Sequence, residues 1–185
     1  SYQKALRLKP NYTLAHQNLG VALSKLGKLK KAVVSYRKAL SFKPDFAEAH
    51  NNLGNAFLRL GEPDDAVASC RKALAIKPDL VEAHNNLGNA LRDFGKVEDA
   101  VASFQKALVL KPDYAEVHCN LGTALRDLHR LEEAEDSYQR ALSIRPDFTE
   151  ALGSYGILLL ALGRRQEALS YFRKRLELVR GGNPA

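Results

Sequence analysis

Proline recurs at a constant spacing, and this recurrence constrains the fold more than any other feature of the chain. Five prolines stand 34 residues apart, at Pro10, Pro44, Pro78, Pro112 and Pro146. A period this short makes each unit a single supersecondary element, which cannot bury its apolar side alone. The units must therefore stack into a solenoid. The surface of a solenoid carries its function, so the sequence predicts a binding protein.

The composition excludes several classes of protein. With 45% hydrophobic and 26% charged residues and a formal net charge of +7, the 185-residue chain is typical of folded soluble proteins. Cys70 and Cys119 fall in different repeats, which argues against a disulfide framework and predicts a reducing, cytoplasmic location. The longest apolar run, 157–162, is far short of the roughly 20 residues that span a bilayer, so we expect no membrane partner. Because the chain begins at Ser1 and lacks methionine, we interpret it as a piece of a longer protein.

Each 34-residue unit is expected to form two helices. In residues 79–112, Asp79 and Glu82 have the spacing of a capping box, in which the two side chains bond the first backbone N–H groups of the helix. The apolar stripe that follows ends at Phe94, and Gly95 suits a left-handed helix end. The other repeats have Gly27, Gly61 and Gly163 at this register, whereas His129 breaks the pattern. Gly88 lies inside the first helix at a cost of about 1 kcal/mol. That cost is reasonable if Gly88 allows the two helix backbones to approach closely.

The same pattern divides the whole chain. Residues 1–12 match the end of a truncated preceding repeat, and residues 181–185 form a tail. Between them we expect repeats at 13–46, 47–80, 81–114, 115–148 and, in divergent form, 149–180. In the last of these, Tyr155 replaces leucine, Arg175 replaces a small alanine and Arg180 replaces proline.

These units resemble the tetratricopeptide repeat (TPR). One unit carries the matching residues Leu53-Gly54, Phe57, Ala66, Ala73 and Pro78. The resemblance covers nearly the whole chain, and its register is specific. It implies an all-α helix-turn-helix solenoid that forms a right-handed superhelix, with the first helix of each pair lining a concave groove.

The polar side of each first helix is the candidate binding surface. Asparagine is a poor residue inside a helix, yet it recurs there. A carboxamide can donate and accept hydrogen bonds at once, so it can hold a peptide backbone without selecting side chains. Alternatively, the amides bond one another between repeats or are solvated; these interpretations are not exclusive. The candidate residues are Asn18, Asn51, Asn52, Asn55, Asn85, Asn86, Asn89, Asn120, Glu48, Glu82 and Glu116.

This asparagine column is similar to the asparagine ladder in the TPR arm of the O-linked N-acetylglucosamine transferases. The resemblance implies that Asn18, Asn52, Asn86 and Asn120 grip the backbone of a substrate or adaptor. The carboxylate clamp of other TPR proteins is rejected, because the basic residues it needs are missing from these registers. Two hypotheses follow: a non-enzymatic module that binds an extended peptide, or the substrate-recruiting arm of a larger glycosyltransferase-like or other TPR-fused enzyme.

Other signals are interpreted structurally. His16, His50, His84 and His118 recur once per repeat, too far apart to share a metal, so we expect them to pack at the edge of each helix pair. Cys70 occupies a buried register, whereas Cys119 is expected to face the groove as a reactive thiol. No catalytic, cofactor or metal motif appears, so we expect neither an enzyme nor a bound cofactor.

The remaining expectations concern charge and the ends of the array. Basic residues on the second helices complement the helix dipoles. Nucleic-acid binding is not expected, because the aromatic residues are assigned to the interior. Tyr2, Ala5 and Leu6 form an apolar end that would pack on a second molecule or a missing repeat. At the other end, Ile157 and Leu160 leave the groove apolar, which indicates a capping helix or an apolar anchor on a partner.

Overall fold

The computed structural model describes residues 12–181, and these are all-α, with no strand in the described range. The helices fall into two compact units divided after Lys96, and each unit is considered by itself. Unit 1 contains α2 (Thr13–Lys25), α3 (Leu29–Phe42), α4 (Ala47–Leu60), α5 (Pro63–Ile76) and α6 (Val81–Asp93). Unit 2 contains α7 (Val97–Leu110), α8 (Ala115–Asp127), α9 (Leu131–Ile144), α10 (Thr149–Ala161) and α11 (Arg165–Gly181).

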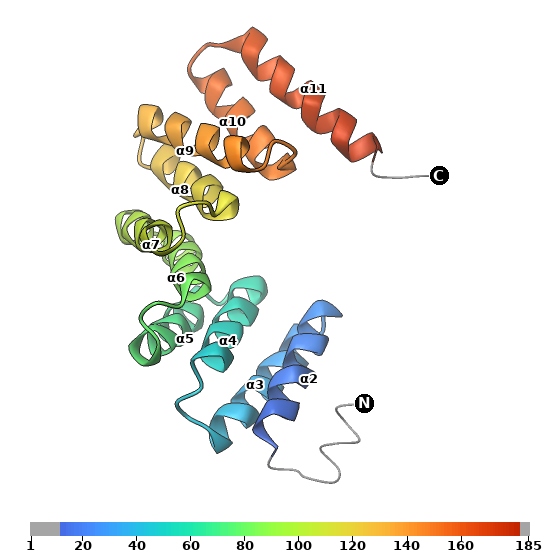
Figure 1. The fold of residues 1–185 in the computed structure, drawn as a ribbon, viewed down its shortest axis with the longest axis vertical. Coiled ribbons are helices and arrows are strands. Elements are labelled where there is room, and N and C mark those ends of the chain that lie inside the picture. The colour runs from blue at the N-terminus through green and yellow to red at the C-terminus, as the bar shows by residue number, and fades with distance from the viewer. Residues whose placement is uncertain (1–11, 182–185) are drawn as a thin grey trace. The chain divides into compact units, whose positions relative to one another are not determined.

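Consecutive helices pack side by side within each unit (Figure 1). In unit 1, α2 pairs with α3 and α4 with α5, while α3 and α5 pack on the first helix of the next repeat. The first helices α4 and α6 also touch. In unit 2 the pairs are α8 with α9 and α10 with α11, and α8 also touches α10. The predicted helix-turn-helix class is therefore confirmed; the predicted end repeat at residues 1–12 lies almost wholly outside the described residues.

The turn inside each helix pair has the predicted left-handed backbone. The φ angles of Gly27, Gly61, Gly95 and Gly163 lie between 71° and 82°. His129 stands at the same register and adopts the same conformation, with φ 58°. A residue with a side chain is disfavoured there by about 1 kcal/mol or more, so the packing of α8 on α9 imposes this turn on an unsuitable residue.

The expected capping boxes are wrong. The residues that precede α4, α6, α8 and α10 are Phe46, Leu80, Tyr114 and Phe148, and none of these helices has a side-chain hydrogen bond at its cap. The aspartates stand one residue earlier, in the Pro-Asp turn. The position next to the helix is taken by an aliphatic or aromatic side chain, buried at Phe148 and partly exposed in the other three cases, which displaces the aspartate from the capping position.

Glycines inside the first helices accommodate side chains rather than backbone. A Cβ atom added to Gly20, Gly122 or Gly156 would lie within 2.9 Å of a ring atom of Tyr36, Tyr138 or Phe172, respectively. At Gly54 the nearest atom is the Sγ of Cys70, at 2.6 Å. The close approach of backbones expected from the sequence is thus a minor part of the explanation. The glycine makes room for one large or polarizable side chain of the paired helix.

The divergent last repeat is held by a polar network. The Tyr155 hydroxyl donates to Glu135 Oε1 at 2.6 Å, and Arg164 Nη1 donates to both carboxylate oxygens at 2.6 and 2.8 Å. Hydrogen bonds from Tyr155 and Arg164 lower the pKa of Glu135. Burial, followed by the bond to Glu135, raises the pKa of Tyr155 to about 12. Tyr155, which departs from the repeat pattern, is therefore bonded to Glu135 of α9, which departs from the pattern as well.

Candidate peptide-binding surface

The predicted surface residues lie on first helices, but their side chains are not equally accessible. Those of Asn51 and Asn85 are buried, with 8% and 4% of their surface exposed. Asn52 and Asn86, which follow them, are partly exposed. Asn55, Asn89 and Asn120 are also partly exposed, and Asn18, Glu48, Glu82 and Glu116 are exposed. The first asparagine of each Asn-Asn pair therefore belongs to the protein interior, whereas the second reaches the surface.

One amide bridge joins two repeats in unit 1. Asn86 Nδ2 of α6 donates to Asn51 Oδ1 of α4 over 2.8 Å. This bond is the inter-repeat pairing that the sequence left open as an alternative to peptide contact. A buried carboxamide needs such a partner, because an unsatisfied one would cost about 1–3 kcal/mol. Asn86 retains its amide oxygen and a second N–H for other contacts.

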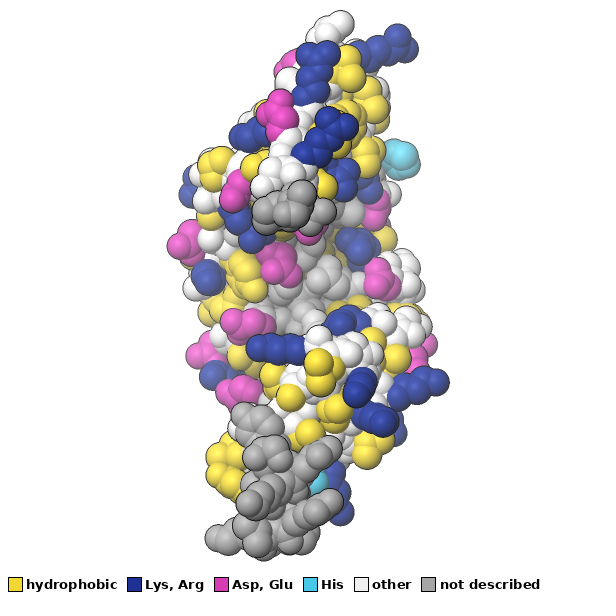
Figure 2. Space-filling model, turned by 90° about the vertical axis from the view of Figure 1, so that its right-hand side faces the viewer, with side chains coloured by type: hydrophobic (Ala, Val, Ile, Leu, Met, Phe, Trp, Pro, Cys, Tyr) yellow, Lys and Arg dark blue, Asp and Glu magenta, His cyan; other side chains and the backbone are white. Residues whose placement is uncertain are grey.

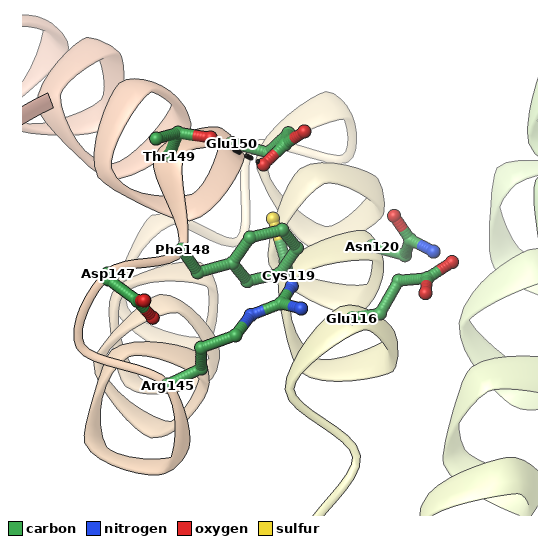
Figure 3. A pocket seen from close by; sticks show the side chains of 8 residues that line it. All are labelled: Glu116, Cys119, Asn120, Arg145, Asp147, Phe148, Thr149 and Glu150. Atoms are coloured by element: carbon green, nitrogen blue, oxygen red, sulfur yellow. Dashed lines mark hydrogen bonds between the residues drawn. The ribbon is translucent and has the colours of Figure 1, made fainter. Parts of the chain in front are cut away.

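Unit 2 contains a cavity of about 570 Å³ beside two of the predicted residues (Figure 3). Glu116, Cys119 and Asn120 come from α8, and Arg145 from the end of α9. The Pro-Asp turn and the first residues of α10 complete the lining with Asp147, Phe148, Thr149 and Glu150. The structure thus brings Glu116 and Asn120 together with five residues that the sequence analysis did not assign to the site. Their fixed offset from the proline could have found them.

The polar groups of this cavity are ordered by neighbouring contacts. The Arg145 guanidinium lies over the Phe148 ring, 3.4 Å from its centre. Thr149 Oγ1 donates to Glu150 Oε2 at 2.8 Å. This bond, together with a backbone N–H and the charges of Arg145 and Arg175, lowers the pKa of Glu150. Glu150 is accordingly held as a carboxylate at the rim of the cavity.

A weak ion pair borders the surface in unit 1. Lys77 Nζ lies 3.4 Å from Glu48 Oε1, and both side chains are about half exposed. Exposed pairs of this kind contribute about 0–1 kcal/mol and are screened by salt. Glu48 therefore stays accessible to a ligand.

The two cysteines are both free and both buried. Cys70 has no exposed surface, and burial raises the pKa of its thiol to about 12, which confirms its expected role as a small hydrophobic residue. Cys119 lines the cavity, but only 5% of its surface is exposed. The expectation of an accessible, reactive thiol at Cys119 is therefore wrong. The residue faces the expected side, but its side chain is buried there.

The repeated histidines bond the repeated prolines. The Nε2–H of His50 donates to the Pro44 carbonyl at 2.9 Å. His84 and His118 bond the carbonyls of Pro78 and Pro112 in the same way, at 2.8 Å each. Each histidine thus satisfies a carbonyl at the end of the preceding second helix, six residues earlier. In residues 12–181 no group of three or more histidine, cysteine and acidic side chains could hold a metal ion.

We expect His118 to make the protein less stable in acid. Burial lowers its pKa, the bond to Pro112 partly opposes this, and Arg140 lowers it further. In the unfolded chain the histidine pKa is about 6.5, so the unfolded chain binds more protons than the folded protein does. The stabilisation is present above that pH and is lost as the pH falls through and below it. Urea unfolding of the wild type and of His118→Gln at pH 5 and 8 measures the difference. An equal pH dependence of both proteins would contradict it.

The expected interior position of the aromatic residues is wrong at several sites. Phe42 and Phe94 are exposed by 39% and 42%. Lys38 and Lys96 place their ammonium groups over these two rings, at 5.1 and 5.2 Å from the ring centres. Phe42 is the last residue of α3 and Phe94 directly follows α6, so both rings lie at helix ends, where fewer neighbouring side chains can bury them. This exposure removes one premise of the argument against nucleic-acid binding.

The apolar C-terminal end of unit 2 is exposed as predicted. Ile157 and Leu160 of α10 and Leu169 and Leu176 of α11 all show large exposed fractions. Figure 2 shows hydrophobic side chains among Lys and Arg at its upper end, where α11 lies. What covers this face stays a prediction. Through residues 12–181, no helix has the length and apolar character that crossing a membrane requires.

The geometry defines a class of protein: a solenoid of helix pairs that repeat every 34 residues. The first helix of each pair exposes a polar face. Family models for the tetratricopeptide repeat match residues 1–34, 47–80, 115–148 and 151–183, and a further TPR repeat model matches 22–61 and 88–128. Together they account for most of the chain. The chain therefore belongs to the tetratricopeptide repeat family.

Solved structures of TPR proteins are similar over most of the chain. TTC0263, a thermophilic TPR protein of Thermus thermophilus, is 28% identical, with a TM-score of 0.78 over 90% of this chain and 91% of that one. MamA is 29% identical, with a TM-score of 0.75 over 88% and 95%. YrrB, described as a TPR protein with an unusual peptide-binding site, is 22% identical with a TM-score of 0.72 over 96% and 92%, a likeness that shows the fold alone. A search of the curated proteins finds no match.

Proposed function

We propose that the chain is a non-enzymatic protein-interaction module that binds an extended peptide along the polar face of its first helices. The observation that carries this proposal is the difference in burial between the two asparagines of each Asn-Asn pair. Asn51 and Asn85 are buried, while Asn52 and Asn86 reach the surface. In unit 1, Asn18, Asn52 and Asn86 would contact the peptide backbone, with Asn55, Asn89, Glu48 and Glu82 beside them. In unit 2, Asn120 and Glu116 would do so at the cavity.

The buried amides have a supporting role in this proposal. The Asn86–Asn51 bond fixes the Asn86 side chain before any ligand arrives. A side chain that is already ordered loses less conformational freedom on binding, which saves about 0.5–1.5 kcal/mol per side chain. The remaining donor and acceptor of Asn86 match a peptide N–H and C=O. Recognition of this kind would depend on the peptide backbone more than on its side chains.

A random peptide library displayed on phage would supply the probe for this proposal. We expect Asn52→Ala to weaken binding of a selected peptide about five- to tenfold, because one net hydrogen bond contributes about 1 kcal/mol. The melting temperature of the Asn52→Ala variant should equal that of the wild type. Asn86→Ala should weaken binding and also lower the melting temperature, because the buried Asn51 loses its hydrogen-bond donor. Fluorescence anisotropy and thermal unfolding measure the two effects.

The matched control is Gln105→Ala, which removes an exposed amide from the second helix α7. It should leave both affinity and stability unchanged. Methylation of the peptide backbone nitrogens should weaken binding more than alanine substitution of peptide side chains. Selected peptides whose affinity is unaffected by Asn52→Ala would remove the asparagine column from the proposal.

The location and attachment of the module are separate proposals. Two free, buried thiols support a reducing, cytoplasmic setting. A role as the recruiting arm of a glycosyltransferase-like enzyme stays a prediction from the asparagine column, and a transferase domain in the parent open reading frame would support it. End-to-end association through Tyr2, Ala5 and Leu6 concerns residues outside the described range, and light scattering of the full chain would test it. Nucleic acid is not proposed as a partner.

A further inference from the structure

The cavity in unit 2 lies where other residues replace the two amides of the unit 1 bridge. The positions that carry Asn51 and Asn86 in unit 1 carry Cys119 and Ser154 in unit 2, two repeats further along. A thiol and a hydroxyl at these two positions cannot form the amide-to-amide hydrogen bond that joins Asn86 to Asn51. The space between α8 and the start of α10 holds a cavity of about 570 Å³. A change in the repeat pattern thus coincides with an opening in the candidate binding surface.

The side chains around this cavity leave an excess of negative charge. The lining contributes three carboxylates, from Glu116, Asp147 and Glu150, against the single guanidinium of Arg145, a formal excess of two negative charges. One negative charge remains in excess when Arg175, whose charge also acts on Glu150, is counted. Figure 3 shows Glu116 and Asn120 on the α8 side and Glu150 on the α10 side, with the Arg145 and Phe148 side chains next to one another below Glu150. The chain as a whole carries +7, so this excess is local and does not follow from composition.

The positive groups near the cavity are already engaged. Arg145 is stacked 3.4 Å from the Phe148 ring centre, and its charge and that of Arg175 help to hold Glu150 ionised. The partial positive charge at the start of α10 is offset by Glu150, which stands in the first turn of that helix. An anionic ligand group would therefore meet the surplus carboxylates, whereas a cationic group would complement them.

We propose that this cavity is a specificity subsite that accepts a basic side chain, arginine or lysine, of the extended peptide. The inference rests on the proposed function: the asparagine column would hold the backbone without selecting sequence, and this subsite would add a preference for one charged residue. The ligand side chain would enter between α8 and the start of α10, and its charged end would reach Glu116 and Glu150. The Asn120 amide would bond the adjacent peptide group.

Small probes separate this inference from the proposed function. Nα-acetyl-arginine methylamide, its neutral citrulline analogue and the glutamate analogue would each be titrated into the labelled chain and followed by the amide resonances of residues 116–120 and 148–150. We expect the arginine probe to bind about fivefold more tightly than the citrulline probe, as one accessible ion pair allows. Added salt should reduce that preference.

Charge-removing variants identify the residues responsible. Glu116→Gln and Glu150→Gln should each reduce the preference for arginine over citrulline, while the exposed Asp136→Asn on α9 should leave it intact. Equal binding of arginine and citrulline probes, or tighter binding of the glutamate probe, would overturn the subsite. Library peptides that depend on Asn52 but show no basic residue would also overturn it, and would leave the peptide-binding proposal standing.

Discussion

Glu135→Val and Tyr155→Leu should each destabilise unit 2, whereas the double variant should be close to the wild type. Elsewhere the same two registers carry a valine and a leucine, as at Val67 and Leu87 in unit 1, which are both buried. Both have changed in unit 2, to Glu135 in repeat 115–148 and to Tyr155 in the divergent last repeat, and the two share a 2.6 Å hydrogen bond. The two substitutions compensate each other. Tyr155→Leu leaves Glu135 bonded to Arg164 but without the tyrosine hydroxyl, and Glu135→Val leaves the Tyr155 hydroxyl with the Gln139 donor but without its acceptor.

The expected size follows from the burial of the network. Tyr155 is almost fully buried, and the Glu135 side chain is 18% exposed. Losing one member should cost about 1–3 kcal/mol, while replacing both by apolar groups of fitting shape can be nearly neutral. Urea unfolding of the four proteins of the cycle measures the coupling directly. Strictly additive effects would show that the two replacements in the sequence are unrelated.

The second large effect is expected at the contact between α4 and α5. A Cβ atom at position 54 would lie 2.6 Å from Cys70 Sγ and 3.3 Å from the carbonyl oxygen of Ala66. Gly54→Ala should therefore destabilise unit 1 by about 2 kcal/mol net, because overpacking outweighs the gain of about 1 kcal/mol in helix propensity. Cys70 has no exposed surface and cannot turn outward.

Removing the sulfur should restore stability. Cys70→Ala alone is expected to cost about 1 kcal/mol through a small cavity, and the added methyl of Gly54→Ala fills that space in the double variant. The double variant should thus be more stable than Gly54→Ala alone. Thermal unfolding followed by circular dichroism provides the test. A double variant that is less stable than both single variants would mean that the helix backbones, rather than the sulfur, limit the space.

Local signals predicted the elements well where one residue decides the backbone. Gly27, Gly61, Gly95 and Gly163 mark the turns they were expected to mark, because only glycine adopts a positive φ without strain. His129 departs from the pattern without changing the turn, because packing of the adjoining helices overrides local preference. The capping boxes failed for a related reason. Asp79 and Glu82 have the right spacing, but Leu80 occupies the position next to the helix.

Sequence alone determined the 34-residue period, the pairing of helices within each repeat and the polar side of the first helices, since these depend on spacing along one chain. Only the tertiary structure decided which amide of each Asn-Asn pair is buried. Neighbouring helix residues point about 100° apart, so the packing of the next repeat buries Asn51 and leaves Asn52 at the surface. The cavity beside Asn120 likewise depends on side chains from three helices, α8, α9 and α10, whose approach no single segment specifies.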